Sequence, residues 1–165
     1  MEKSAGRVLH KLYDLNVPYR IYEQPPLPTI GEAEKYWKNI EATHCKNIFF
    51  RNHKGNRHYL VVLEHHAILD IHDLEKRLKQ GKLTFASPKR MKKYLDLEPG
   101  SVSPFGLIND AENHVHLFLD EQLLKAEKIS FHPNINTATV VIPFTGFISF
   151  LDDTGNSYEF LKLYD

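Results

Sequence analysis

NIFFRNHKGNRHYLVVL, residues 47–63, contains the clearest structural signal in the chain. Two runs rich in Phe, Ile, Tyr and Val, Asn47–Asn52 and Arg57–Leu63, flank the four residues His53–Asn56, which include a glycine. Runs of this composition around a short glycine-containing connection predict a β-hairpin. We expect this hairpin to lie at the centre of a sheet.

Helical and extended patterns alternate on both sides of the hairpin. Val8, Leu12 and Leu15 recur at helical spacing, and Ser87-Pro88 pairs a capping serine with a proline suited to the first helical position. The spacing of Thr29 and Glu32 matches a capping box. The patterns predict helices over residues 4–16, 30–37, 70–79, 88–96 and 143–155, a loop over 100–106, and further strands over 19–23, 83–86, 114–119, 128–131, 138–142 and 158–163.

This order of elements predicts an α+β fold. We expect one domain over residues 1–165, with a mixed, curved, barrel-like sheet flanked by helices rather than a doubly wound parallel sheet. The chain has 165 residues with 42% hydrophobic and 25% charged side chains, which is typical of a globular protein with its own core. No run approaches the roughly 20 apolar residues that span a bilayer. One cysteine forms no internal disulfide, so we expect a cytoplasmic protein.

Charge is balanced overall, with 21 basic and 21 acidic residues, but it is unevenly distributed. The 19 residues from Glu75 to Lys93 hold eight basic side chains against one acid, a net charge of +7. Such a face can hold a phosphate backbone, or it can simply be the solvated side of two helices. The candidate phosphate-binding residues nearest its end are Lys89, Arg90, Lys92 and Lys93.

Common catalytic motifs are missing from the sequence. It contains no GxSxG, P-loop, GxGxxG or paired CxxC motif. The pairs His65-His66 and His114/His116 have no third ligand nearby in the chain, so we expect no metal site. Cys45 lies between His44 and Lys46, yet a lone cysteine at a strand start is more often a small buried side chain than a nucleophile.

Three segments share the order and spacing of a known family. They are CKNIFFR (45–51) with GNRHYLVV (55–62), GSVSPFGLIND (100–110) and FHPNINTAT (131–139). Together they resemble the prolyl-tRNA editing superfamily, with its YbaK-type or INS-type domain. The resemblance covers nearly the whole chain and is greatest to the free-standing alanyl-tRNA(Pro) deacylase branch, which includes the ProX-type and PrdX-type proteins.

The resemblance implies a set of functional positions. Lys46 matches the lysine of the catalytic cleft, Asn47 matches the free-standing branch, and His132 matches a substrate-binding histidine before proline. The GxxxP loop that walls the cleft corresponds to Gly100, Ser101, Val102, Ser103 and Pro104. The chain departs from the pattern at Gln24, where a histidine is usual, and this leaves the preferred amino acid open.

The implied reaction is hydrolysis of mischarged alanyl-tRNA(Pro) into free amino acid and tRNA. The aminoacyl ester is already activated, so modest catalysis suffices. Because the sequence shows no cluster of metal ligands and Cys45 is a poor candidate nucleophile, we expect no cofactor, no metal and no covalent intermediate. A synthetase site built for proline discriminates poorly against a smaller amino acid, by only about 1–3 kcal/mol for each missing methylene, so a second and smaller site is useful. Ile48, Phe50 and Val102 are candidate walls of that site.

The implied partner is the acceptor end of proline tRNA, with prolyl-tRNA synthetase as a candidate partner and neither DNA nor membrane involved. Two alternatives stay open at this point. One is a deacylase of the same type that acts on cysteinyl-tRNA(Pro) or another small aminoacyl-tRNA. The other is a binding module that holds tRNA or an amino acid without catalysis, although such a module has no need for Lys46-Asn47, the GxxxP loop and His132 together.

Overall fold

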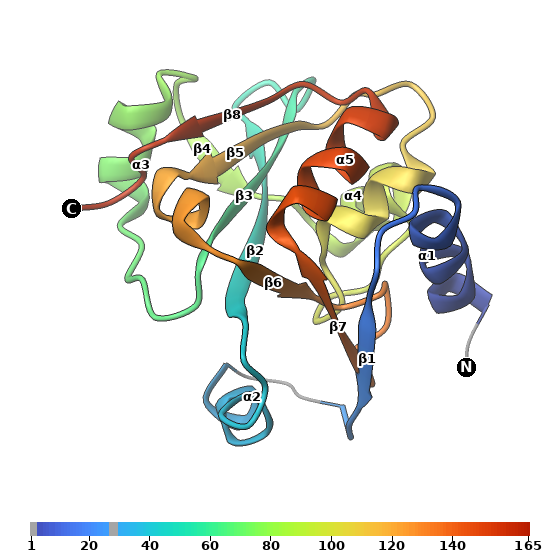
Figure 1. The fold of residues 1–165 in the computed structure, drawn as a ribbon. Coiled ribbons are helices and arrows are strands. Elements are labelled where there is room, and N and C mark those ends of the chain that lie inside the picture. The colour runs from blue at the N-terminus through green and yellow to red at the C-terminus, as the bar shows by residue number, and fades with distance from the viewer. Residues whose placement is uncertain (1–2, 27–29) are drawn as a thin grey trace.

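The computed structural model describes residues 3–26 and 30–165. Its helices are α1 (Lys3–Asp14), α2 (Ile30–Trp37), α3 (Ile71–Leu78), α4 (Pro88–Leu95) and α5 (Phe144–Thr154), with two short 3-10 helices, η1 (Pro104–Asn109) and η2 (Glu121–Lys125) (Figure 1). The strands are β1 (Arg20–Glu23), β2 (Thr43–Asn52), β3 (His58–Glu64), β4 (Leu83–Phe85), β5 (His116–Asp120), β6 (Lys128–Phe131), β7 (Ala138–Pro143) and β8 (Tyr158–Leu161).

The strands form one mixed sheet in the order β1-β7-β6-β2-β3-β5-β8, with β4 paired to β2 outside this path. The β2–β3 pair is antiparallel, with Lys46 opposite Leu63 and Arg51 opposite His58. The β2–β6, β3–β5 and β5–β8 pairs are parallel. The predicted α+β class, the curved mixed sheet and the central hairpin are therefore confirmed, and the sheet is open, with β1 and β8 at its ends.

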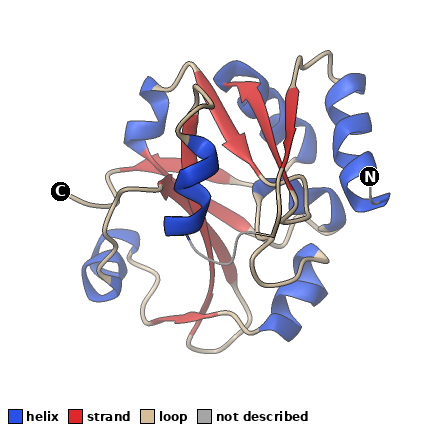
Figure 2. Cartoon of the chain, turned by 90° about the horizontal axis from the view of Figure 1, so that it is seen from below, coloured by secondary structure: helices blue, strands red, loops and turns tan. Residues whose placement is uncertain are grey.

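Strand β3 is buried on both faces, which explains its continuous apolar run. Leu60 and Val62 belong to one core cluster, whereas Tyr59, Val61 and Leu63 belong to the other. Side chains that alternate along a strand point to opposite faces of the sheet. The larger cluster is covered by α1, α4, η1 and α5, and the smaller one by α3, so that helices surround the strands (Figure 2).

The predicted helix boundaries have the expected capping interactions. The Asp70 carboxylate accepts hydrogen bonds from the backbone N–H groups of His72 and Asp73, and the Ser87 hydroxyl accepts one from that of Arg90. Such caps stabilise a helix by about 0.5–2 kcal/mol. Helix α5 ends at Gly155, whose φ of 81° favours glycine.

The structure differs from the predicted elements in three places. Strand β2 begins at Thr43 rather than Asn47, and η1 occupies the end of the predicted 100–106 loop. The η2 helix was not predicted, because five residues are too few to show a helical period. The predicted Thr29 cap lies outside the described residues, although α2 begins where that cap would place it. Among the described residues, no helix is long and apolar enough to cross a membrane.

Candidate functional site

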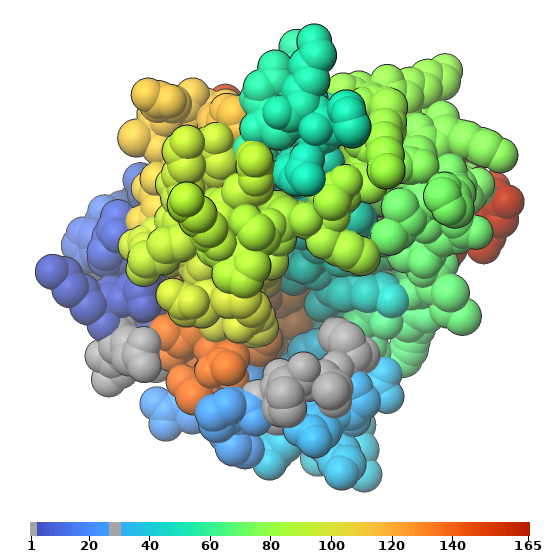
Figure 3. All heavy atoms as spheres, turned by 180° about the vertical axis from the view of Figure 1, so that it is seen from behind, coloured from blue at the N-terminus to red at the C-terminus, as the bar shows by residue number. Residues whose placement is uncertain are grey.

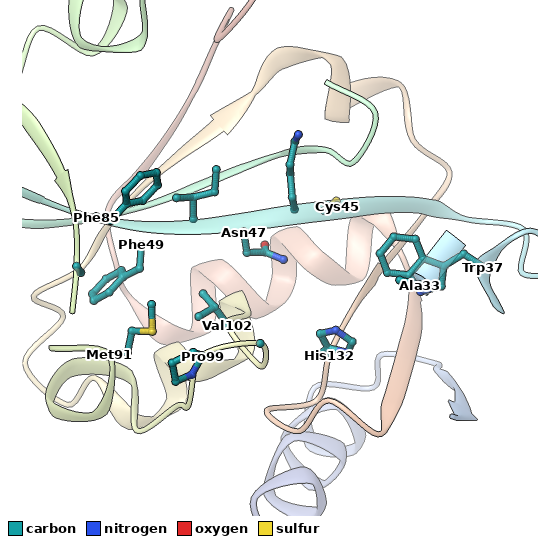
Figure 4. Close-up of a pocket in the computed structure, with 14 residues that line it drawn as sticks. Ala33, Trp37, Cys45, Asn47, Phe49, Phe85, Met91, Pro99, Val102 and His132 are labelled. Carbon is teal, nitrogen blue, oxygen red and sulfur yellow. The ribbon is translucent and has the colours of Figure 1, made fainter. Parts of the chain in front are cut away.

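A cleft of about 330 Å³ lies along the β2 strand. Six of the predicted site residues line it: Lys46, Asn47, Ile48, Gly100, Val102 and His132. They come from β2, the loop after α4 and the loop after β6, which are far apart in the chain (Figure 4). The remaining lining residues were not predicted from the sequence: Ala33, Trp37, Cys45, Phe49, Phe85, Ala86, Met91 and Pro99.

The cleft exists because one edge of β2 is left open over a few residues. Strand β6 pairs with β2 only at Thr43 and His44, and β4 pairs with it only at residues 50–52. Between these points, the described strands leave the edge opposite β3 without a partner. The Phe49 carbonyl points to this edge, since it accepts a hydrogen bond from the Ala86 N–H. Alternation along the strand then points the backbone N–H and C=O of Asn47 to the same edge.

Asn47 also presents its side chain to the cleft. Figure 4 shows its amide directed from β2 toward Val102 and His132. Its Oδ1 atom is buried and has no hydrogen-bond partner within the described residues. A buried acceptor without a partner costs about 1–3 kcal/mol, so it is a feature that needs an explanation. An asparagine amide that lines a cleft can both donate and accept hydrogen bonds, so it is suited to bind a polar group of a ligand.

Lys46 leaves β2 on the other face of the sheet. Cys45 and Phe49 pack in the larger core cluster, while Ile48 and Phe50 pack with the smaller one. Alternation groups the Lys46 side chain with these last two residues, opposite Asn47. Lys46 and Ile48 therefore border the cleft from the far side of the strand, and Phe50, which is fully buried, does not line it.

The Gly100–Pro104 loop divides into residues that face the cleft and residues that hold the loop. Gly100 and Val102 line the cleft, and Gly100 has a φ of 89°, a conformation that strains any L side chain. Ser103 is buried as the cap of η1, where its hydroxyl accepts a hydrogen bond from the Phe105 N–H. Ser101 and Pro104 are also buried and lie outside the cleft lining. Ser103 and Pro104 therefore anchor the loop through η1, and none of the three contacts the cleft.

His132 is held in one orientation by the backbone. Its Nδ1 lies 2.9 Å from the Ala138 carbonyl oxygen, which can only accept a hydrogen bond. Burial lowers the pKa of His132, so the ring is neutral at pH 7. The single ring proton is then on Nδ1, and Nε2 is left as an acceptor. Figure 4 shows this ring below Cys45, on the same side of β2 as Asn47.

Cys45 lines the cleft but is a poor nucleophile. It is buried, and burial raises the pKa of its thiol well above the usual range. Because only the thiolate attacks readily, the expectation of a small buried side chain is confirmed. Gln24, the residue that departs from the family pattern, lies outside the cleft lining and accepts a hydrogen bond from the Thr139 hydroxyl through Oε1.

The basic segment lies on α3, α4 and the connection between them, which share the face shown in Figure 3. Lys89, Lys92 and Lys93 are exposed on α4, although Lys92 pairs with Asp96 at 2.7 Å. Arg90 is engaged internally: its Nη1 donates to the Gly55 carbonyl at 2.9 Å and lies 3.0 Å from His58 Nε2. Arg90 therefore holds the hairpin turn against α4, and of the four predicted tRNA-binding residues the three lysines are the exposed ones.

The histidine pairs behave differently from the sequence expectation. His114 and His116 form side-chain hydrogen bonds within the protein, the first with His58 and the second with Ser157 and Glu159. His65 and His66, for which the sequence offered no nearby third ligand, gather with Glu34 of α2, about thirty residues earlier in the chain. This third donor could not be expected from the neighbouring sequence, because it reaches the pair only where α2 folds back beside the end of β3.

Comparisons with known proteins show which family the chain resembles. A family model described as an aminoacyl-tRNA editing domain matches residues 24–150. The prolyl-tRNA editing protein ProX of Acetoanaerobium sticklandii is 37% identical over 157 residues, which are 94% of this chain and 95% of that protein. The prolyl-tRNA synthetase associated domain-containing protein 1 of Bos taurus is 29% identical over 150 residues, 88% of this chain and 87% of that protein.

The fold is also found among solved structures. One described as a proposed trans-editing enzyme for prolyl tRNA synthetase has a TM-score of 0.71 at 22% identity and covers 98% of both chains. A hypothetical protein gives a TM-score of 0.70 at 18% identity, covering 92% of this chain and 96% of its own. These likenesses concern the fold, while the family model spans most of the sequence. The chain belongs to the aminoacyl-tRNA editing domain family.

Proposed function

We propose that this chain hydrolyses the ester bond of misacylated proline tRNA, with alanine as the preferred amino acid, and that it works in the cytoplasm on tRNA released from prolyl-tRNA synthetase. The observation that carries the proposal is the meeting of Asn47, Gly100 and His132 in one cleft. Membership of the editing family and the 37% identity to a prolyl-tRNA editing protein support it. The substrate is the acceptor end of the tRNA, with the amino acid attached to its terminal ribose.

Asn47 is placed to hold the amino acid. The substrate carries an α-ammonium group, which offers hydrogen-bond donors and a positive charge. The Oδ1 atom of Asn47 lacks a partner in the described chain, and the backbone carbonyl beside it faces the same open edge of β2. A hydrogen bond from a charged donor stabilises a complex by about 1.5–3 kcal/mol. Asn47 thus anchors the α-ammonium group, which is common to the amino acids that the site could receive.

His132 is placed to orient the ribose. With its proton on Nδ1 and shared with Ala138, its Nε2 can accept a hydrogen bond from a ribose hydroxyl or from the attacking water. The backbone contact also keeps the ring from rotating. A fixed acceptor of this kind reduces the entropy lost on reaching the transition state.

The loop at Gly100 is placed to serve the ester carbonyl and the attacking water. Among the described residues, a Cβ at Gly100 would meet only Asn136, at 3.9 Å, so the backbone there is exposed to the cleft rather than packed. Backbone N–H groups directed at a developing oxyanion stabilise the tetrahedral intermediate without needing a charged residue. Water attacks, the ester C–O bond breaks, and the proton lost by the water ends on the ribose oxygen that leaves.

The walls of the cleft near Asn47 are mostly apolar, which suits a small apolar amino acid such as alanine. Val102, Phe49 and Met91 close it on the side of α4, and Cys45 lies in β2 beside Asn47. Lys46, on the far face of the strand, is suited to a phosphate of the terminal nucleotides rather than to the carbonyl. The lysines of α4 extend this contact toward the acceptor stem, since Met91 of the same helix lines the cleft.

The proposal can be tested by measuring how fast the ester of alanine-charged proline tRNA is hydrolysed with and without the protein. The purified chain should release free alanine and leave a tRNA that can be charged again, at a rate well above that of spontaneous hydrolysis. His132→Ala should slow this release by about tenfold, the effect of one hydrogen bond of up to roughly 1.5 kcal/mol. An ester lifetime unchanged by the protein would refute the proposal.

A further inference from the structure

A second cleft lies between α2 and the end of β3, and it is lined by Glu34, Trp37, His44, His65 and His66 among others. Of these, only Trp37 also lines the cleft of the proposed reaction. Glu34, His65 and His66 each offer one ligand atom here, and all three atoms lie within 4.8 Å of one another. Two imidazoles and a carboxylate are a donor set that zinc and similar ions bind.

His65 lies between two carboxylates. Its Nδ1 lies 3.4 Å from Glu34 Oε1, and its Nε2 lies 3.3 Å from Glu64 Oε1. The side chain is only 10% exposed, so the surrounding chain holds the ring in this position. Although Nδ1 faces the Glu34 carboxylate, it makes no hydrogen bond with the described residues.

The neighbouring groups indicate how the His65 ring is oriented. The Glu64 carboxylate is fixed by the backbone N–H of His66, which donates to its Oε2 at 2.9 Å. Glu64 is thus set to accept from Nε2–H of His65, which leaves the buried Nδ1 atom on the side of Glu34. A carboxylate that orients a histidine whose other nitrogen is free is the usual outer-shell arrangement of a metal-binding histidine.

We propose that Glu34, His65 and His66 bind a divalent transition-metal ion of the zinc class and that this ion fastens α2 to the end of β3. A cation between Nδ1 of His65 and the Glu34 carboxylate gives Nδ1 the partner that it lacks among the described residues. Glu34 and His66 are exposed, so their side chains can move in to the short bonds of about 2.0–2.2 Å that zinc requires.

Other groups in this cleft limit the site to these three ligands. His44 is already engaged at both nitrogens, with the Ser130 hydroxyl at 2.5 Å and the Ile40 carbonyl at 3.2 Å. Lys35 and Lys38 of α2 line the same cleft and oppose a cation, while the charge of Glu64 offsets part of this repulsion. The remaining coordination positions are left to water.

An ion at this site would also affect the reaction cleft, because α2 contributes residues to both clefts. Ala33 and Trp37 of α2 form one wall of that cleft, yet they pack in a small apolar cluster of their own with Ile40. Figure 1 shows α2 at the lower end of β2, apart from the other helices. An ion that joins Glu34 to residues 65–66 would hold this wall in place without taking part in ester hydrolysis.

Titration calorimetry with Zn²⁺ on chelator-treated protein at pH 7 tests the proposal. The wild type should bind one equivalent, and Glu34→Gln and His66→Ala should each weaken binding by at least about tenfold. His72→Ala is the matched control, because His72 is an exposed histidine 3.4 Å from the Glu75 carboxylate, and no third donor joins this pair within the described part of the chain. Its Zn²⁺ affinity should equal that of the wild type.

Amide hydrogen exchange over residues 30–37 gives a second readout. Zn²⁺ should slow exchange there in the wild type and in His72→Ala, but not in Glu34→Gln. Equal Zn²⁺ affinity of the wild type and both ligand variants would mean adventitious surface binding only and would overturn the proposal. Failure of the wild type to bind an equivalent would overturn it as well. Neither result depends on whether the chain hydrolyses aminoacyl-tRNA.

Discussion

Replacing Asn47 by leucine should have opposite effects on activity and on stability. The Oδ1 atom of Asn47 is buried without a hydrogen-bond partner in the described chain, so the free protein bears a penalty that leucine, of similar size, removes. The free energy of unfolding should rise by about 1–3 kcal/mol. The same change removes the acceptor for the substrate's ammonium group, a bond that contributes about 1.5–3 kcal/mol, so kcat/KM should fall by about 10–160-fold.

Urea unfolding and initial rates of alanyl-tRNA(Pro) hydrolysis measure the two effects on the same preparation. Asn156→Ala is the matched control, because Asn156 is also a buried asparagine but donates to Asp110 Oδ2 and to the Val115 carbonyl, both at 2.8 Å. That variant should lose about 1–3 kcal/mol of stability and keep its KM. An Asn47→Leu protein that is less stable and fully active would show that Asn47 is a structural residue and would refute the assignment.

Three further changes separate the chemistry, the tRNA surface and the stability of the fold. Cys45→Ala should keep most of the hydrolytic activity, as should chelator-treated protein, because the buried thiol is protonated; loss of activity would reinstate a nucleophilic cysteine. Lys89, Lys92 and Lys93 changed together to Glu should weaken tRNA binding and flatten its dependence on salt, while hydrolysis of a minimal aminoacyl-adenosine survives; unchanged tRNA affinity would make them solubilising residues only. Burial, with His114 and Arg90 nearby, lowers the pKa of His58 from 6.5 to about 4. As the pH falls, the unfolded chain therefore binds a proton at this histidine before the folded chain does. The free energy of unfolding, which is highest above pH 6.5, should fall by up to about 2 kcal/mol between pH 7 and pH 5. His58→Phe should show a smaller fall by urea unfolding at the two pH values, and an equal fall would assign the effect to other groups.

Much of the fold could be predicted because local signals and tertiary environment agree. The hairpin has a glycine in its turn, where Gly55 adopts a φ of 74°, and β3 has a continuous apolar run because both of its faces are buried. The caps at Asp70 and Ser87 each fixed a helix start. The start of β2 was missed, because Thr43 and His44 pair with β6, a partner more than eighty residues away.

The site was predicted only in part, because family motifs specify positions and not the direction of side chains. Asn47, Gly100 and His132 do meet, but Lys46 and Phe50 leave β2 on the opposite face, as a strand that alternates from Asn47 requires. Ser103 proved to be a cap for η1, a helix that the sequence pattern did not reveal. Arg90 looked like one more surface cation until the fold placed the hairpin turn against it.

The contribution of α2 could not be predicted at all. Trp37, the single tryptophan of the chain, lines the cleft from a helix that precedes β2, and Glu34 of the same helix reaches His65 and His66. These contacts depend on how α2 is set beside the end of β3, and nothing in the residues of α2 alone indicates that placement.

Hydrolysis of proline tRNA charged separately with alanine, cysteine, serine and proline, under single-turnover conditions with the same enzyme, is the most direct test. We expect alanyl-tRNA(Pro) to be cleaved fastest and prolyl-tRNA(Pro) to be spared, because an editing site must reject the amino acid that the synthetase correctly attaches. Faster cleavage of the cysteinyl or seryl ester would change the preferred amino acid but leave the reaction, hydrolysis of a misacylated proline tRNA, unchanged. Equal rates for all four esters, or rapid loss of the prolyl ester, would contradict an editing function.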